Sequence, residues 1–157
     1  MKANIGIPEK ELQAIGVMLN KLLADEYVLY TKTKFYHWNV EGEDFHPMHL
    51  FFDEQAEKLE GFIDDVAERV RALGHFAVGS LKTFLDLTNL LENTDAATDA
   101  LKMVQNLLND HETIIRQLRQ DVDHTANKLK DVGTSDFLTG IMEEHEKMAW
   151  MLRAFLK

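Results

Sequence analysis

Apolar residues recur every three or four positions along four long stretches of the chain, which is the spacing of one face of an α-helix. The first stretch begins at Pro8, a residue favoured in a first helical turn, and runs to about Tyr36. The second begins at Pro47 and runs to Gly74, a residue typical of the position that follows a helix end. Because no stretch alternates as a half-buried strand does, the pattern predicts helices throughout.

The second half of the chain continues this pattern after a long connection. Residues 75–94 form the connection, in which "SLKTFLDL" predicts a short amphipathic helix. A third helix follows "NTD" and extends towards Val122, and Gly133 is expected to break the chain before a last helix, residues 134–156. We therefore predict an all-α four-helix bundle with a short extra helix between helices 2 and 3, as a single domain over residues 1–157.

Composition limits the chemistry that this bundle could carry. The chain has no cysteine, so disulfides and thiolate metal sites are excluded. The net charge of −10 repels phosphate backbones and attracts cations. No apolar run approaches the roughly 18 residues that span a bilayer, and "MKANIGIPEKE" lacks the apolar core of a signal peptide. We expect a cytoplasmic protein without a membrane partner.

The second helix combines an apolar face with an acidic one. At about 100° per residue, the apolar residues gather in one arc that must face the bundle core. The opposite side carries an acidic stripe, which begins with a histidine and contains no Lys or Arg: His49, Asp53, Glu57, Glu60, Asp64 and Glu68. A solvated surface is one interpretation of this stripe. Unpaired like charges one turn apart cost stability, however, and a bound cation would relieve that cost.

Two pairs in the stripe have the spacing of metal ligands. His49 and Asp53 are four residues apart, as are Asp64 and Glu68, so each pair projects side by side from the helix. Asp53 and Asp64 are separated by about 16 Å of helix, too far to share one ion within a chain. A second copy packed antiparallel about a two-fold axis would unite the pairs and create two sites per dimer. His37, at the end of the first helix, is the natural additional ligand.

Mixed imidazole and carboxylate ligation favours particular metals. With open positions it fits Fe(II), Mn(II) or Zn(II) better than Ca(II) or Cu(I). The E-x-x-H pairs that a di-iron site inside a bundle needs on two helices are missing. The histidines at 111, 124 and 145 lie on predicted helices and are expected to be exposed or hydrogen-bonded. The sequence therefore places its metal chemistry on the outward face of the second helix.

The segments "HWNVEGEDFHPMHLFFDE" and "DDVAERVRALG" resemble the signature of the Dps family, the dodecameric mini-ferritins. The resemblance covers most of the chain and implies a ferritin-like fold. It implies that His37, His49 and Asp53 are ferroxidase ligands from one subunit, and that the two-fold partner supplies Asp64 and Glu68. This ligand set agrees with the argument from the helix face.

The resemblance also implies a function. Fe(II) would be oxidised at the shared sites, preferentially by hydrogen peroxide, and ferric mineral would be stored in a hollow shell of twelve subunits. Zn²⁺ and Mn²⁺ are potential competitors for the sites, and no haem is expected. Trp38 matches the tryptophan beside the family's site, where two roles stay open: absorbing oxidising equivalents and packing.

Two aspartates are candidates for a second site that the resemblance implies, an iron-entry pore. Asp121 aligns loosely with aspartates that line an iron-entry pore on the three-fold axis, and Asp131 is a candidate to join it. An exposed helix acid is the alternative interpretation of Asp121. The pore assignment rests on the resemblance alone.

The family name refers to DNA binding, but this chain has few of the basic residues that usually mediate it. Family members that condense DNA commonly use flexible Lys- or Arg-rich tails. Only about seven residues precede the first predicted helix here, with Lys2 the sole basic one, and the chain stops almost where its last helix ends. A DNA-compacting stress protein with a secondary metal site remains the alternative function, and a helical interaction module with a merely acidic face is a third.

Overall fold

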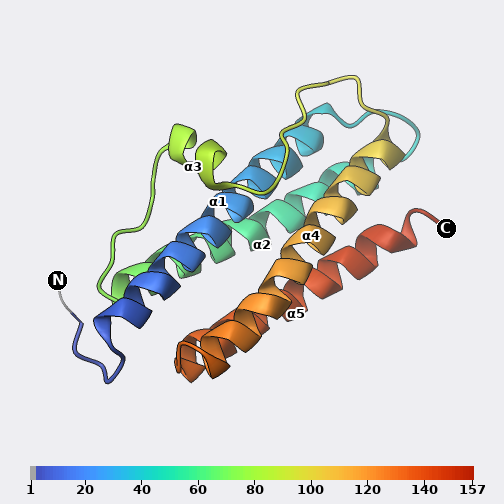
Figure 1. The fold of residues 1–157 in the computed structure, drawn as a ribbon. Helices are drawn as coiled ribbons and strands as arrows, with labels where there is room; N and C mark the ends of the chain where they lie inside the picture. Colours follow the sequence, from blue (N-terminus) through green and yellow to red (C-terminus); the bar gives the residue numbers. More distant parts are fainter. Residues whose placement is uncertain (1–2) are drawn as a thin grey trace.

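The computed structural model describes residues 3–157, and it contains four long helices and a short one, with no strand among the described residues. The helices are α1 Glu9–Asn39, α2 Phe45–Ala72, α3 Leu81–Leu87, α4 Ala100–Asn127 and α5 Val132–Ala154. In Figure 1, α1 and α2 form one hairpin, α4 and α5 form another, and α3 lies in the long connection between them. The predicted all-α bundle with its short extra helix is confirmed.

The helices pack around one apolar core, built from the faces that the periodicity predicts. Its largest fully buried side chains come from α1, from α2 with its C-cap residue, and from α4: Tyr36, Phe52, Leu12, Ile15, Leu19, Leu23, Leu29, Leu59, Leu73, Met103, Leu107 and Ile114. Burying each leucine, isoleucine or phenylalanine contributes about 1.5–3 kcal/mol. The same packing leaves the acidic stripe of α2 on the outside, from Glu57 to Glu68.

Helix ends differ from the prediction at several places, and α2 begins at Phe45, two residues before the predicted start at Pro47. The first helix continues to Asn39, which keeps the residues after Tyr36 helical, and α4 continues to Asn127. The predicted break at Gly133 is wrong, because Gly133 lies in the first turn of α5. Asp131 is the N-cap, its carboxylate accepting a hydrogen bond from the Thr134 amide at 2.9 Å, so α5 begins two residues earlier than expected.

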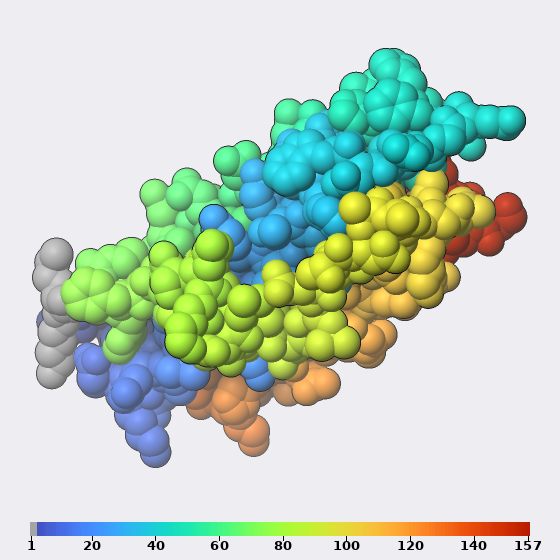
Figure 2. All heavy atoms as spheres, turned by 90° about the horizontal axis from the view of Figure 1, so that it is seen from above, coloured from blue at the N-terminus to red at the C-terminus, as the bar shows by residue number. Residues whose placement is uncertain are grey.

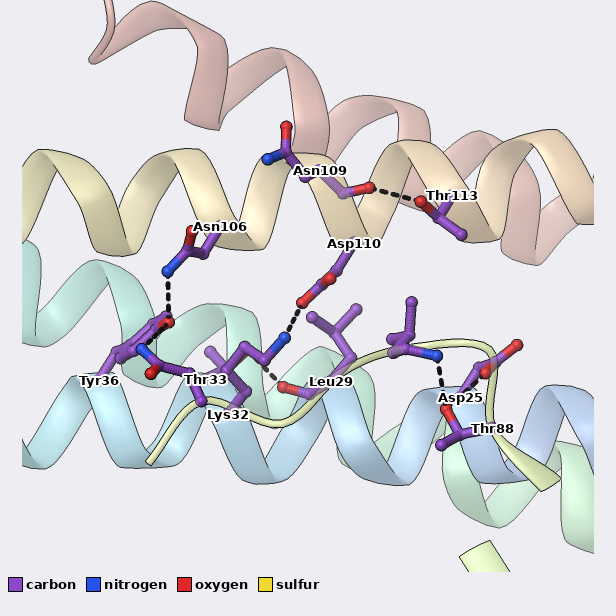
Figure 3. A network of polar contacts seen from close by, with 12 residues as sticks. Asp25, Leu29, Lys32, Thr33, Tyr36, Thr88, Asn106, Asn109, Asp110 and Thr113 are labelled. Carbon is purple, nitrogen blue, oxygen red and sulfur yellow. Dashed lines mark hydrogen bonds and ion pairs between the residues drawn. The ribbon is translucent and has the colours of Figure 1, made fainter. Parts of the chain in front are cut away.

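The connection between α2 and α4 is fixed to α1 by buried polar contacts. Gly74, with φ of 91°, ends α2 as predicted, and the Ser80 hydroxyl caps α3. Figure 2 shows the connection lying along α1 on one side of the molecule. In Figure 3, the buried Asp25 carboxylate accepts hydrogen bonds from the connection, including one from the Thr88 hydroxyl at 2.7 Å. These contacts hold the crossover in one position.

Two further contacts in Figure 3 join α1 to α4. The Lys32 ammonium donates to the Asp110 carboxylate at 2.5 Å, and both side chains are largely buried. Burial raises the pKa of Asp110, although the hydrogen bond from Lys32 opposes this effect. The Tyr36 hydroxyl accepts a hydrogen bond from Asn106 at 2.9 Å. Removing one member of such a buried ion pair costs about 3–5 kcal/mol, so these contacts fix the register of the two hairpins.

Among residues 3–157, no helix combines the length and the apolar character that a membrane span requires.

Candidate metal centre

The histidines at the junction of α1 and α2 bond reciprocally to each other's backbone. The His37 Nδ1 atom donates to the His49 carbonyl oxygen at 2.8 Å, and the His49 Nδ1 atom donates to the His37 carbonyl oxygen at 2.8 Å. The two rings stack with centroids 3.9 Å apart. Because a carbonyl oxygen can only accept, each Nδ1 carries a proton. In the neutral rings the Nε2 atoms therefore have lone pairs available for a metal.

Asp53 lies beside this pair, as the helical spacing predicts. Its Oδ1 atom is 3.7 Å from the His37 Nε2 atom. His37 is buried, while His49 and Asp53 are partly exposed, so the group lies between the core and the surface. A metal has ligand bonds of about 2 Å, so these side chains would have to rearrange before all three could bind one ion. These three residues form one part of the predicted ligand set.

The Asp53 carboxylate is paired with a lysine that the stripe itself does not contain. The Lys34 ammonium, one turn before His37 on α1, donates to the Asp53 Oδ1 atom at 2.7 Å. This hydrogen bond lowers the pKa of Asp53 and raises the pKa of Lys34. The ammonium is a cation close to the position where a metal would bind. A divalent metal must therefore displace it from the carboxylate.

The other predicted ligands lie on the same face of α2 but not at the same point. Asp64 and Glu68 are both exposed, three and four turns beyond Asp53. In residues 3–157 of a single chain, no three His, Asp or Glu side chains are grouped so that they could hold a metal ion. Trp38, the neighbour of His37, is 67% exposed, so it does not pack in the core of its own subunit.

The two aspartates predicted for a pore lie in different surroundings. Asp121 is partly exposed on α4, where it accepts a hydrogen bond from Gln117 at 2.9 Å and where burial raises its pKa. Asp131 is only 4% exposed and is the N-cap of α5. Its carboxylate also accepts from the Arg69 guanidinium at 3.3 Å. These contacts give Asp131 a capping role within the chain, and the pore assignment of both residues stays a prediction.

Sequence reasoning missed two features of the site. The first is Lys34, because a search along one helix does not find a partner on the neighbouring helix. The spacing of three residues between Lys34 and His37 could have indicated that both reach the same site. The second is the reciprocal bonding of the two imidazoles, for which the sequence has no separate signal, since it depends on how α1 and α2 pack.

A four-helix bundle that presents imidazoles and carboxylates from its helices has the architecture of the ferritin-like proteins. The family model described as "Ferritin-like domain" matches residues 17–157. The chain is 47% identical over 156 residues to an uncharacterised low temperature-induced protein of Nostoc sp., covering 99% of this chain and 87% of that protein. It is 39% identical over 139 residues to DNA protection during starvation protein 2 of Bacillus anthracis, covering 88% and 94% of the two chains.

Solved structures agree with these sequence relatives. The crystal structure of the Dps protein from Vibrio cholerae O1, described as a member of a broad superfamily of ferritin-like diiron-carboxylate proteins, superimposes with a TM-score of 0.93. It is 32% identical to this chain, and the match covers 100% of this chain and 98% of that one. The chain therefore belongs to the Dps family of ferritin-like proteins.

Proposed function

We propose that this protein is a ferroxidase that oxidises Fe(II), preferentially with hydrogen peroxide, and stores the ferric product as mineral inside a hollow shell of twelve subunits in the cytoplasm. The observation that carries the proposal is the reciprocal bonding of His37 and His49, which leaves both Nε2 atoms available beside Asp53. Two neutral imidazoles and a carboxylate are ligands that suit Fe(II).

The remaining ligands are proposed to come from the two-fold partner. Asp53 and Asp64 point the same way along α2, but about 16 Å of helix separates them. Antiparallel packing of two copies of α2 would bring Asp64 and Glu68 of the partner subunit opposite His49 and Asp53. By symmetry, each dimer would contain two such sites. The exposure of both acids on the single chain is compatible with this arrangement.

The chain's own residues would each have a defined task in the reaction. The imidazoles of His37 and His49 bind Fe(II) through Nε2, and their Nδ1 hydrogen bonds fix the ring orientation. The carboxylates balance the charge of the metal, and Lys34 must first leave Asp53. Two Fe(II) ions each give one electron to a peroxide, whose O–O bond breaks to form two hydroxide ions. Two-electron reduction releases no hydroxyl radical, which would protect the cell from oxidative damage.

Trp38 and the competing metals extend this proposal. Trp38 follows a ligand directly and is exposed, so it could donate an electron when a site holds only one Fe(II). Packing against another subunit is the other role that its exposure allows. Zn²⁺ and Mn²⁺ accept the same donors and should inhibit by competition. No haem takes part in the proposed reaction.

Asp121 and Asp131 are proposed to line the route by which Fe(II) enters the shell. Asp121 is the better candidate of the two, because its side chain is partly exposed, whereas Asp131 is only 4% exposed. Asp131 would have to serve the pore while capping α5. Slower Fe(II) uptake in Asp121→Asn, with unchanged oxidation of iron already bound, would support the assignment.

One experiment tests the proposed function as a whole. The purified protein is titrated with Fe(II) without oxygen, peroxide is added, oxidation is followed optically, and the mass of the assembly is measured in parallel. The proposal predicts two Fe(II) oxidised per peroxide, in a twelve-subunit particle, faster than with equimolar oxygen. Faster oxidation by air would contradict the peroxide preference, and no Fe(II)-dependent change would contradict ferroxidase activity altogether.

DNA compaction is the competing function, since several relatives carry the name DNA protection during starvation protein. The net charge of −10 opposes binding to a phosphate backbone. A DNA band that is retarded at low salt and released at moderate salt would favour compaction. No retardation even at low salt would dismiss it.

A further inference from the structure

A second group of titratable side chains lies in the centre of the bundle, away from the metal centre. Glu26 of α1, His111 of α4 and His145 of α5 are each 0% exposed. The His145 Nε2 atom lies 2.8 Å from the Glu26 Oε1 atom, and the Nδ1 atoms of His111 and His145 are 2.8 Å apart. The ring of Phe62 from α2 covers His145 at 5.5 Å. We call Glu26, His111 and His145 the core triad.

The two contacts of the core triad determine where its protons can lie. Each contact is bridged by one proton, because two bare nitrogens or two N–H groups cannot share a contact of 2.8 Å. The outer atoms, Glu26 Oε2 and His111 Nε2, have no hydrogen-bond partner among the described residues. A core triad of zero net charge therefore holds one proton in each contact and a third on one of these outer atoms.

A further proton would disrupt this arrangement. It gives the core triad a net positive charge at a place where all three side chains are fully buried, which is costly. If His145 is the donor between the imidazoles, protonating His111 puts hydrogens on both Nδ1 atoms, and the contact is lost. If His111 is the donor, the contact persists, but the buried imidazolium has no partner for its Nε2–H among the described residues. Within the described residues no ion pair reaches the core triad from outside. The nearby Lys32 and Asp110 pair with each other and cannot compensate the added charge.

We propose that the core triad is a proton-controlled lock between the two helical hairpins, closed near neutral pH and opened when it takes up one more proton in acid. Glu26 belongs to the α1–α2 hairpin, whereas both histidines belong to the α4–α5 hairpin. The contact between Glu26 and His145 therefore crosses from one hairpin to the other. The added proton weakens the docking of the two halves, either by breaking the contact between the imidazoles or by leaving an uncompensated charge in the core.

The direction of the pH effect follows from proton linkage. Burial, together with the neighbouring His145, holds the pKa of His111 well below its ordinary value of 6.5. The unfolded chain takes up that proton near pH 6.5, so it binds more protons than the native state at lower pH. The contribution of His111 to stability is therefore complete above about pH 6.5 and is lost as the pH falls below it.

The test compares two variants that carry the same substitution on the same helix. In His111→Gln, the amide oxygen can still accept from the His145 Nδ1 atom, but the site no longer titrates. His124→Gln is the matched control, because His124 is exposed on α4. Unfolding by urea is measured between pH 7.5 and 5 on metal-free, full-length protein at one protein concentration.

The lock predicts a specific difference between these proteins. Below about pH 6.5, the unfolding equilibrium constant of the wild type should rise by about tenfold per pH unit relative to that of His111→Gln. His124→Gln should behave as the wild type. If His111→Gln and the wild type lose stability in parallel, the proposal is wrong.

A second measurement decides the matter if His111→Gln does not fold. Hydrogen exchange at the imidazole C2 position, followed by mass spectrometry on the wild type, reports the titration of each histidine. In the folded protein His111 should show no titration near pH 6.5, whereas in the urea-unfolded chain the same histidine should titrate there. Ordinary titration of His111 in the folded protein would overturn the lock.

Discussion

The protein contains two pairs of neighbouring histidines, and the pairs use their Nδ1 atoms in different ways. In the surface pair, His37 and His49, each Nδ1 donates to a backbone carbonyl. In the buried pair, His111 and His145, the two Nδ1 atoms bond to each other. The partner of Nδ1 thus distinguishes the two pairs: a backbone partner leaves Nε2 free for the proposed metal, and an imidazole partner joins α4 to α5.

The carboxylates beside the two histidine pairs differ in their exposure and in their bonding partners. Asp53 is partly exposed and paired with a lysine that a metal can displace. Glu26 is fully buried and bonded to an imidazole from the other hairpin. Solvent screens the first interaction and not the second. Substitutions in the surface group should therefore change the chemistry, while substitutions in the buried group should change stability.

The largest effect is expected from breaking the buried group. His145→Leu leaves the Glu26 carboxylate buried without its partner, so the free energy of unfolding should fall by about 3–5 kcal/mol. Urea denaturation at pH 7.5 measures this loss. The same substitution at the exposed His124 should change stability by no more than about 0.5 kcal/mol. Equal losses in the two variants would show that the buried contacts contribute no more to the free energy of unfolding than an exposed histidine does.

The next largest effect is expected from the surface carboxylate. Asp53→Asn removes the charge of a proposed ligand and disturbs no core contact, so oxidation of Fe(II) by peroxide should slow by about 100-fold or more while helicity and melting stay unchanged. Stopped-flow absorbance measures the rate. Glu57→Gln removes a neighbouring exposed charge that is not a proposed ligand, and it should oxidise iron as the wild type does. A slow Glu57→Gln variant would indicate that general acidity, not ligation, drives the reaction.

The smallest effect is expected from the lysine that occupies the carboxylate. Lys34→Gln removes an ammonium that competes with the metal, so Co²⁺, a redox-stable probe, should bind about two- to fivefold more tightly at low salt. The gain should shrink as salt is added. Lys58→Gln is the control, because Lys58 pairs with Glu144 of α5 instead. Weaker Co²⁺ binding by Lys34→Gln would mean that the lysine supports the site.

The parts of the molecule that lie on a single helix could be predicted from the sequence. Helical spacing alone placed His49 and Asp53 one turn apart on the outward face of α2, and it placed Asp64 and Glu68 further along that face. The four long helices and the short α3 followed from the same periodicity. Local geometry decides these features, so a local pattern reveals them.

The parts that depend on packing between helices could not be predicted in this way. Lys34 reaches Asp53 across the α1–α2 interface, and Glu26 reaches His145 across the bundle. The sequence distances are 19 and 119 residues, and no periodicity connects such positions. The start of α5 was missed for another reason: the capping bond of Asp131 outweighs the tendency of Gly133 to end a helix.

The most direct test of the account asks whether each iron site is shared between two chains. One variant lacks His49 and Asp53, and another lacks Asp64 and Glu68. Each variant alone should be nearly inactive, because every site in it lacks one half. When the two are unfolded, mixed and reassembled, one site of each mixed dimer draws intact ligands from both chains, while the other site has lost both halves.

Peroxide-driven Fe(II) oxidation is then compared in the mixed and the parent assemblies, with the mixed composition verified by mass spectrometry. The account predicts that activity returns on mixing, at up to half of the wild-type site count in each mixed dimer. If all ligands of a site came from one chain, neither variant chain would have a complete ligand set, and mixing would restore no activity. A verified mixed assembly that stays as inactive as its parents would contradict the shared site.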